Sequence, residues 1–230
     1  MSIFDAFKPK PKIKGEIGYF GLADWWLSEF TEAERNHIET VFRPLSTGGA
    51  QKSLTEGEIY STTGTAVGLL YALAGWFKKP DDIHIAKRIL AKAEAMLPTA
   101  PVLDQHFAYH TMIEIYEKDK QNPSRLDLVA SYCRKQIEIA PNAIKAFKRD
   151  GRKSGDLRLP SHGGYSTLGD ILEKAGATDE AIAIYQQAKR QGWAGAWDKY
   201  IERMEKPAKP KTQRRNKADA PTSGGSPTPP

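Results

Sequence analysis

Apolar residues recur through most of the chain at intervals of three and four, the spacing that places them on one face of a helix. The pattern predicts helices over residues 22–30, 32–42, 55–77, 83–97, 103–116, 126–140, 165–175, 179–191 and 196–206. No segment alternates apolar and polar residues for long enough to indicate a β-strand. The predicted fold class is therefore all-α.

Two Thr-x-x-Glu motifs mark predicted helix starts. Thr31 and Glu34 precede one amphipathic segment, and Thr55 and Glu58 precede another. In such a capping box the threonine side chain accepts a hydrogen bond from a backbone N–H, and the glutamate accepts one from the threonine N–H. We therefore expect a helix to begin at each motif, with a loop over residues 44–53.

An internal repeat of small and large residues runs through the predicted helices. One helix carries Ala181, Tyr185 and Ala188, with Trp193 just beyond it. The same spacing recurs in Ala86, Leu90, Ala93 and Pro98, and more loosely in Val129, Cys133, Gln136 and Pro141. Small side chains allow two helix backbones to approach closely, and the larger one fills the groove between them. The repeat predicts pairs of packed helices.

The helices that precede these share a second pattern, and together the two resemble the tetratricopeptide (TPR) repeat. The positions are Tyr165, Leu168, Gly169 and Leu172 in one unit, and Leu70, Leu73, Ala74 and Phe77 in another. The strongest match covers residues 162–195, with Trp193 in place of the family's final proline. The second covers 67–100, where Asp81 replaces the turn glycine. A middle unit around Tyr109 fits only with a longer loop.

The resemblance implies antiparallel helical hairpins stacked in a right-handed array. We expect an N-terminal helical cap and a C-terminal closing helix over residues 196–206 to cover its ends. Members of the family usually bind protein or peptide segments in a concave face, through exposed positions of each first helix. In the last unit those positions are Ser166, Asp170, Glu173 and Lys174. They lack the Lys/Asn set of the carboxylate-clamp members.

Charge divides the 230-residue chain into a body and two basic ends. The formal net charge is +6, but residues 1–14 hold four lysines against one aspartate. Residues 206–230 hold six basic residues against one acidic residue and are rich in Pro, Gly, Ser and Thr. We expect a flexible basic segment over 1–14, one helical domain over 15–206 and a disordered tail over 207–230.

The composition indicates where the protein is located and which kinds of site it can contain. The first residues contain no continuous apolar stretch typical of a secretory signal, and the longest apolar run, residues 64–77, is short for a membrane span. The single cysteine, Cys133, excludes an internal disulfide framework. We expect a cytoplasmic protein with no cofactor, no metal site, no catalytic residues and no membrane association.

Histidines supply two candidate sites. His106, His110 and Glu114 follow one another at four-residue intervals and could present metal ligands on one helix face. No glutamate directly follows His106, so this is not the HExxH signature, and a helix face at the edge of the core explains the pattern better. His162 lies in a Pro-Ser-His-Gly-Gly loop before the last repeat, where it could cap the helix or contact a partner.

One basic cluster lies inside the body of the chain. It comprises Lys145, Lys148, Arg149, Arg152, Lys153 and Arg158. We interpret residues 145–158 as a solvated loop that could bind an anion, namely a nucleic acid, a phosphate or an acidic partner.

The sequence thus favours a non-catalytic protein-interaction scaffold. The alternative is a nucleic-acid-associated protein that uses its basic ends and the 145–158 cluster, and an enzyme with dispersed site residues is a third hypothesis.

Overall fold

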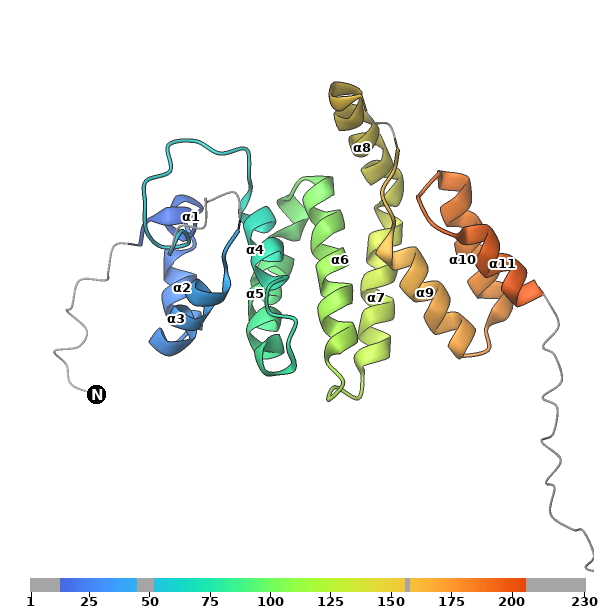
Figure 1. Ribbon diagram of the computed structural model, residues 1–230, viewed down its shortest axis with the longest axis horizontal. Coiled ribbons are helices and arrows are strands. Elements are labelled where there is room, and N and C mark those ends of the chain that lie inside the picture. The colour runs from blue at the N-terminus through green and yellow to red at the C-terminus, as the bar shows by residue number, and fades with distance from the viewer. Residues whose placement is uncertain (1–12, 45–51, 156–157, 206–230) are drawn as a thin grey trace, which may run out of the picture.

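A computed structural model describes residues 13–44, 52–155 and 158–205. Within these ranges the chain is helical, and the β interaction present is an isolated parallel bridge between Ser161 and Ala194 (Figure 1). The all-α prediction is confirmed. The predicted tail over 207–230 and most of the segment 1–14 lie outside the described residues.

The α-helices are α1 (Gly15–Tyr19), α2 (Ala23–Glu29), α3 (Glu32–Val41), α4 (Ala66–Ala74), α5 (Ile83–Met96), α6 (Val102–Lys118), α7 (Arg125–Glu138), α8 (Ala140–Ser154), α9 (Gly163–Lys174), α10 (Thr178–Gln191) and α11 (Trp197–Glu205). The helices α4 to α7 and α9 to α11 are arranged along the long axis of the molecule after the N-terminal helices, and α8 lies above α6 and α7 (Figure 1). Short 3₁₀ turns precede and follow α5.

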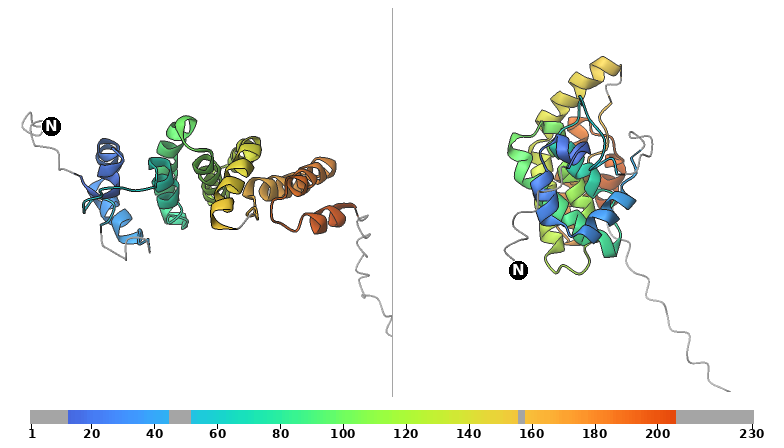
Figure 2. Two further views of the ribbon diagram at one scale, coloured as in Figure 1. Left: turned by 90° about the horizontal axis from the view of Figure 1, so that it is seen from above. Right: turned by 90° about the vertical axis from the view of Figure 1, so that its left-hand side faces the viewer.

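Three helical hairpins form the body: α4 with α5, α6 with α7, and α9 with α10. Each later hairpin packs on the one before it through its first helix, because α6 contacts both α4 and α5, and α9 contacts both α6 and α7. The views from above and from the end show an elongated stack (Figure 2). In the sequence, helix α8 lies between the second and third hairpins. In space it contacts α6 and α7.

Small residues lie where the paired helices meet. The alanines of the two clearest repeats are fully buried, as predicted: Ala86, Ala93, Ala181 and Ala188. Gly169 in α9 faces Tyr185 in α10, and a Cβ added to the glycine would lie 2.3 Å from the tyrosine ring. The close approach of α9 and α10 therefore requires a residue without a side chain at this position.

The N-terminal cap consists of α1, α2 and α3. The capping box predicted at Thr31 is confirmed: the Glu34 N–H donates to Thr31 Oγ1 at 3.2 Å, and the Thr31 N–H donates to Glu34 Oε2 at 2.8 Å. Trp26, Phe30 and Ile38 fill the interior of the cap. The sequence pattern predicted α2 and α3 but not the short α1.

Thr31→Ala tests the contribution of this capping box. Loss of the capping acceptor is expected to lower the free energy of unfolding by about 1 kcal/mol. Urea denaturation followed by circular dichroism measures the change. Thr40→Ala in the same helix is the control, because the Thr40 hydroxyl donates only to the Asn36 carbonyl one turn earlier and caps nothing. An equal loss in both variants would contradict a capping role.

The second predicted capping box is wrong. Residues around Thr55 and Glu58 form turns and irregular backbone, and α4 begins only at Ala66. The Thr55 hydroxyl donates to Glu39, and Gly57 has a left-handed φ of 89°, which a continuing helix does not allow. Thr65 provides the actual cap, accepting a hydrogen bond from the Gly68 N–H at 2.8 Å.

The prediction of a loop over residues 145–158 is also wrong, because α8 occupies Ala140–Ser154. Its buried side carries Ala140, Ala143 and Ala146. Pro141 lies in the first turn of α8, where proline is favoured, and so belongs to the start of a new helix. Gly155 ends α8 in the left-handed conformation, with φ of 79°.

The two segments that flank the α9–α10 hairpin meet each other, and α11 packs on its second helix. Its two flanking segments meet at the Ser161–Ala194 bridge, where the Ala194 N–H donates to the Pro160 carbonyl at 3.1 Å. The predicted closing helix is present as α11, which packs on α10. The Trp197 indole N–H donates to the Trp193 carbonyl at 2.7 Å and ties α11 to the hairpin.

Candidate functional site

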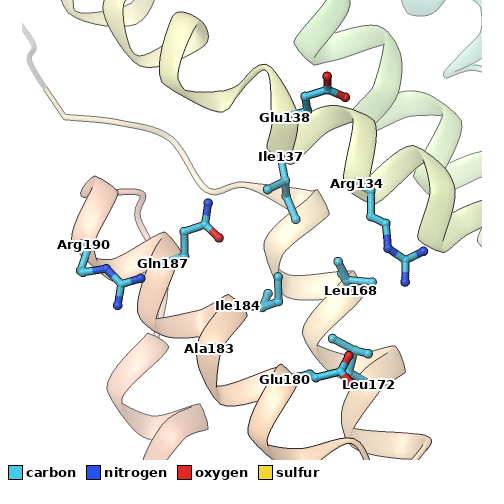
Figure 3. A pocket seen from close by; sticks show the side chains of 10 residues that line it. All are labelled: Arg134, Ile137, Glu138, Leu168, Leu172, Glu180, Ala183, Ile184, Gln187 and Arg190. Atoms are coloured by element: carbon cyan, nitrogen blue, oxygen red, sulfur yellow. The ribbon is translucent and has the colours of Figure 1, made fainter.

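An apolar groove lies over α9, between α7 and α10, and encloses about 590 Å³. Its floor consists of Ile137 from α7, Leu168 and Leu172 from α9, and Ile184 from α10 (Figure 3). Leu168 is buried, and the other three are partly exposed. We call this cavity the aliphatic groove. It exists because α9 packs against both α7 and α10 and forms the floor between them.

Four charged side chains surround the aliphatic groove. Arg134 and Glu138 project from α7, and Glu180 and Arg190 project from α10 (Figure 3). All four are exposed, and in the described part of the chain none forms an ion pair. The rim therefore offers two positive and two negative groups to an occupant.

A second groove, of about 460 Å³, lies on another side of α9, against the start of α7 and the end of α6. Asp170 and Lys174, two of the predicted partner-binding residues, line it together with Leu126, whose side chain is 53% exposed. Asp170 also accepts a hydrogen bond from the Tyr185 hydroxyl at 2.9 Å, which fixes the position of its carboxylate. The structure thus brings these two residues into one groove.

The other predicted partner-binding residues have partners within the chain. The Ser166 hydroxyl donates to the Gly163 carbonyl at 3.0 Å and to the His162 carbonyl at 3.3 Å. Glu173 pairs with Arg203 of the closing helix. The Ser166 contacts stabilise the first turn of α9, and the Glu173–Arg203 pair joins α9 to α11.

His162 is 1% exposed and caps α9, as one of the two sequence interpretations predicted. Its Nδ1 accepts the Tyr165 N–H at 3.3 Å. His106 of α6 lies beside it, with ring centroids 5.0 Å apart, and Trp193 covers both rings. The His106 ring stacks on the indole at 5.4 Å with an interplanar angle of 3°. We call these three side chains the histidine cluster.

Burial makes both histidines poor bases. Burial, together with the nearby imidazoles, lowers the pKa of His106 to about 4 and the pKa of His162 to about 3. Both rings are therefore neutral at neutral pH. His106 Nδ1 and His162 Nε2 are buried and have no hydrogen-bond partner in the protein. Since His162 Nδ1 is an acceptor, the neutral ring carries its hydrogen on Nε2.

His106 and His110 do not share an exposed face. His106 is 2% exposed, whereas the His110 side chain is 43% exposed and lies 3.9 Å from Glu114. The first residue belongs to the core, so the edge-of-core interpretation applies to His110 alone.

Gln136 links three helices beside the histidine cluster. Its side chain is fully buried in α7, and its Nε2 donates to the His106 carbonyl at 2.9 Å. Its Oε1 accepts the Gly164 N–H at 2.7 Å. A Cβ on Gly164 would lie 2.8 Å from that oxygen, so a larger residue there would displace the glutamine amide. These contacts explain why glutamine occupies a small-residue position of the repeat.

The structure places four of the predicted anion-binding residues on one exposed side of α8: Lys145, Lys148, Arg149 and Arg152. Arg158 lies beyond the end of that helix and is exposed. The side chain of Lys153 lies outside the described part of the structure.

No protein-family model matches the chain, and neither does any curated protein or solved structure compared with it. In the described ranges, no helix combines the length and apolar character needed to cross a bilayer. Nor do three or more His, Cys, Asp or Glu side chains gather there in a way that could hold a metal ion.

Proposed function

We propose that this protein is a non-catalytic protein-interaction scaffold, a right-handed TPR-like array that binds an amphipathic helical segment of a partner protein. The aliphatic groove is the binding site. The groove against Asp170 and Lys174 provides further contacts on the first helix of the last hairpin.

The observation that carries the proposal is the composition of the aliphatic groove. Partly exposed aliphatic side chains from three helices form one continuous floor, and uncompensated charges of both signs surround it. A concave apolar surface with a polar rim is typical of sites that bind a protein segment. Burial of the floor would provide affinity, and pairing of the rim charges would orient the segment.

The shape of the groove favours a helical occupant. Leu168 and Leu172 are one helical turn apart on α9, and the walls are the helices α7 and α10. An occupant helix would present apolar residues at i, i+3 or i+4, and i+7 to such a floor. Because the rim has no net charge, acidic and basic residues should both flank that apolar face.

The order of helix contacts supports the TPR-like interpretation. Each hairpin contacts the next through its first helix, and the alanines of the repeat lie between paired helices. Such an array cannot bury every apolar face within one hairpin, so it leaves surfaces available to a partner.

Ala183→Trp tests the site. Ala183 is exposed and lines the groove, so an indole there fills the cavity without entering the core. Peptides are first selected from a phage-displayed library of random linear sequences against the wild-type chain. They should carry the predicted apolar spacing with flanking charges of both signs. Isothermal titration calorimetry should then show at least a tenfold loss of affinity in the variant, about 1.4 kcal/mol.

Ala33→Trp is the matched control, because it adds the same ring at an exposed position of α3. It should bind the selected peptides as the wild type does. Equal affinity of the Ala183→Trp variant, with an unchanged circular dichroism spectrum, would exclude the aliphatic groove as the binding site.

A further inference from the structure

Helix α8 carries a row of basic side chains that the scaffold function does not use. Lys145, Lys148, Arg149 and Arg152 follow at i, i+3, i+4 and i+7, so they share one side of the helix. With a rise of 1.5 Å per residue the row is about 10 Å long. We call these four residues the basic stripe.

The opposite side of α8 is fixed to the array. Ala140, Ala143 and Ala146 are buried there. The Phe147 ring lies 5.4 Å from the His106 ring and 5.8 Å from the Trp193 ring, both centroid to centroid. The helix projects beyond the ends of its neighbours (Figure 1). The basic stripe is therefore held on an accessible, protruding edge.

The charges of the stripe are largely uncompensated. Arg149 donates to the adjacent Asp150 at 3.1 Å, but Lys145, Lys148 and Arg152 form no ion pair with any described residue. By contrast, Arg88 in α5 pairs with two glutamates. The helix dipole favours basic residues only in the last turn, which accounts for Arg152 but not for the two lysines.

We propose that the basic stripe binds the phosphate backbone of double-stranded nucleic acid, without base specificity. A duplex presents about one negative charge per 1.7 Å of axis, so a short protruding row of cations can meet several phosphates without a pocket.

Other polyanions fit this surface less well. An interfacial helix inserts its apolar face into the membrane, but that face of α8 is packed against the array. An acidic peptide would need neighbouring apolar contacts for its side chains, and the grooves described above include no residue of the stripe.

The test measures binding of the full chain to a fluorescein-labelled duplex by anisotropy, over a series of KCl concentrations. DNA and RNA duplexes of the same mixed sequence form two arms. Using the full chain keeps the contribution of the basic residues in 206–230 constant. Replacement of Lys145, Lys148 and Arg152 by glutamine should weaken binding about tenfold or more at low salt. It should also reduce the slope of log K against log[KCl] by about 2 to 3.

The matched control replaces Lys79, Lys118 and Lys120 by glutamine, which removes the same charge from other exposed positions. It should leave the slope close to that of the wild type. The proposal is overturned if both triple variants change the slope equally. It is also overturned if poly-glutamate or anionic lipid vesicles bind as tightly as the duplex with the same dependence on the stripe. These outcomes do not depend on whether the aliphatic groove binds peptides.

Discussion

Replacing Gln136 by leucine is expected to lower the free energy of unfolding by about 1–3 kcal/mol. The glutamine amide satisfies the His106 carbonyl and the Gly164 N–H, and all of these groups are buried between α6, α7 and α9. Leucine has a similar volume but cannot form either hydrogen bond. The His106 carbonyl keeps its helical hydrogen bond within α6, so the Gly164 N–H is the group left without a partner, at a cost of about 1–3 kcal/mol. The loss therefore comes from desolvation and not from a cavity.

Guanidinium denaturation measures this loss. Gln186→Leu is the control, because the same change at an exposed position of α10 should alter stability by no more than about 0.5 kcal/mol. If Gln136→Leu is as stable as this control, the glutamine bridge does not hold α9 against α6 and α7. The linkage of the last hairpin would then rest on apolar packing alone.

Acidification is expected to destabilise the fold between about pH 6.5 and pH 3. His106 and His162 have lowered pKa values of about 4 and about 3, whereas the unfolded chain protonates histidine near 6.5. Below pH 6.5 the unfolded state therefore binds more protons than the folded state, and stability falls with pH. At pH 5 the loss is about 2 kcal/mol for each histidine, or about 4 kcal/mol for both.

Urea denaturation at a series of pH values measures this dependence. His106→Phe keeps an aromatic ring against Trp193 but removes one titrating group, so its stability should decline about half as steeply between pH 6.5 and pH 5. An identical pH dependence in the variant and the wild type would show that burial of His106 does not control the acid response.

The two Thr-x-x-Glu motifs show how far local sequence determines helix starts. At Thr31 the motif precedes apolar residues at helical spacing, and the capping box forms. At Thr55 a glycine with a left-handed φ follows two residues later, and the adjacent Ile59 and Tyr60 are the large apolar residues before Gly64, so no apolar face at helical spacing stabilises a helix there. The motif alone does not determine a helix, because packing supplies most of its stability.

The repeat positions were predictable because burial of Ala86, Ala93, Ala181 and Ala188 follows from helical spacing alone. The aliphatic groove was not. Leu172 and Ile184 are core-like in pattern, and their partial exposure depends on how α7 and α10 lie beside α9. The histidine cluster likewise joins residues far apart in sequence. Its one local signal was His162, whose place before a helix suggested a cap.

The bridge between Ser161 and Ala194 has a consequence for how this chain can change. Because the α9–α10 hairpin starts and finishes at hydrogen-bonded neighbours, its removal or duplication would leave the path of the surrounding backbone nearly unaltered. The hairpin is therefore a unit whose two ends lie side by side. A duplicated copy would present the same two ends, and α11 would then pack on the second helix of the added copy.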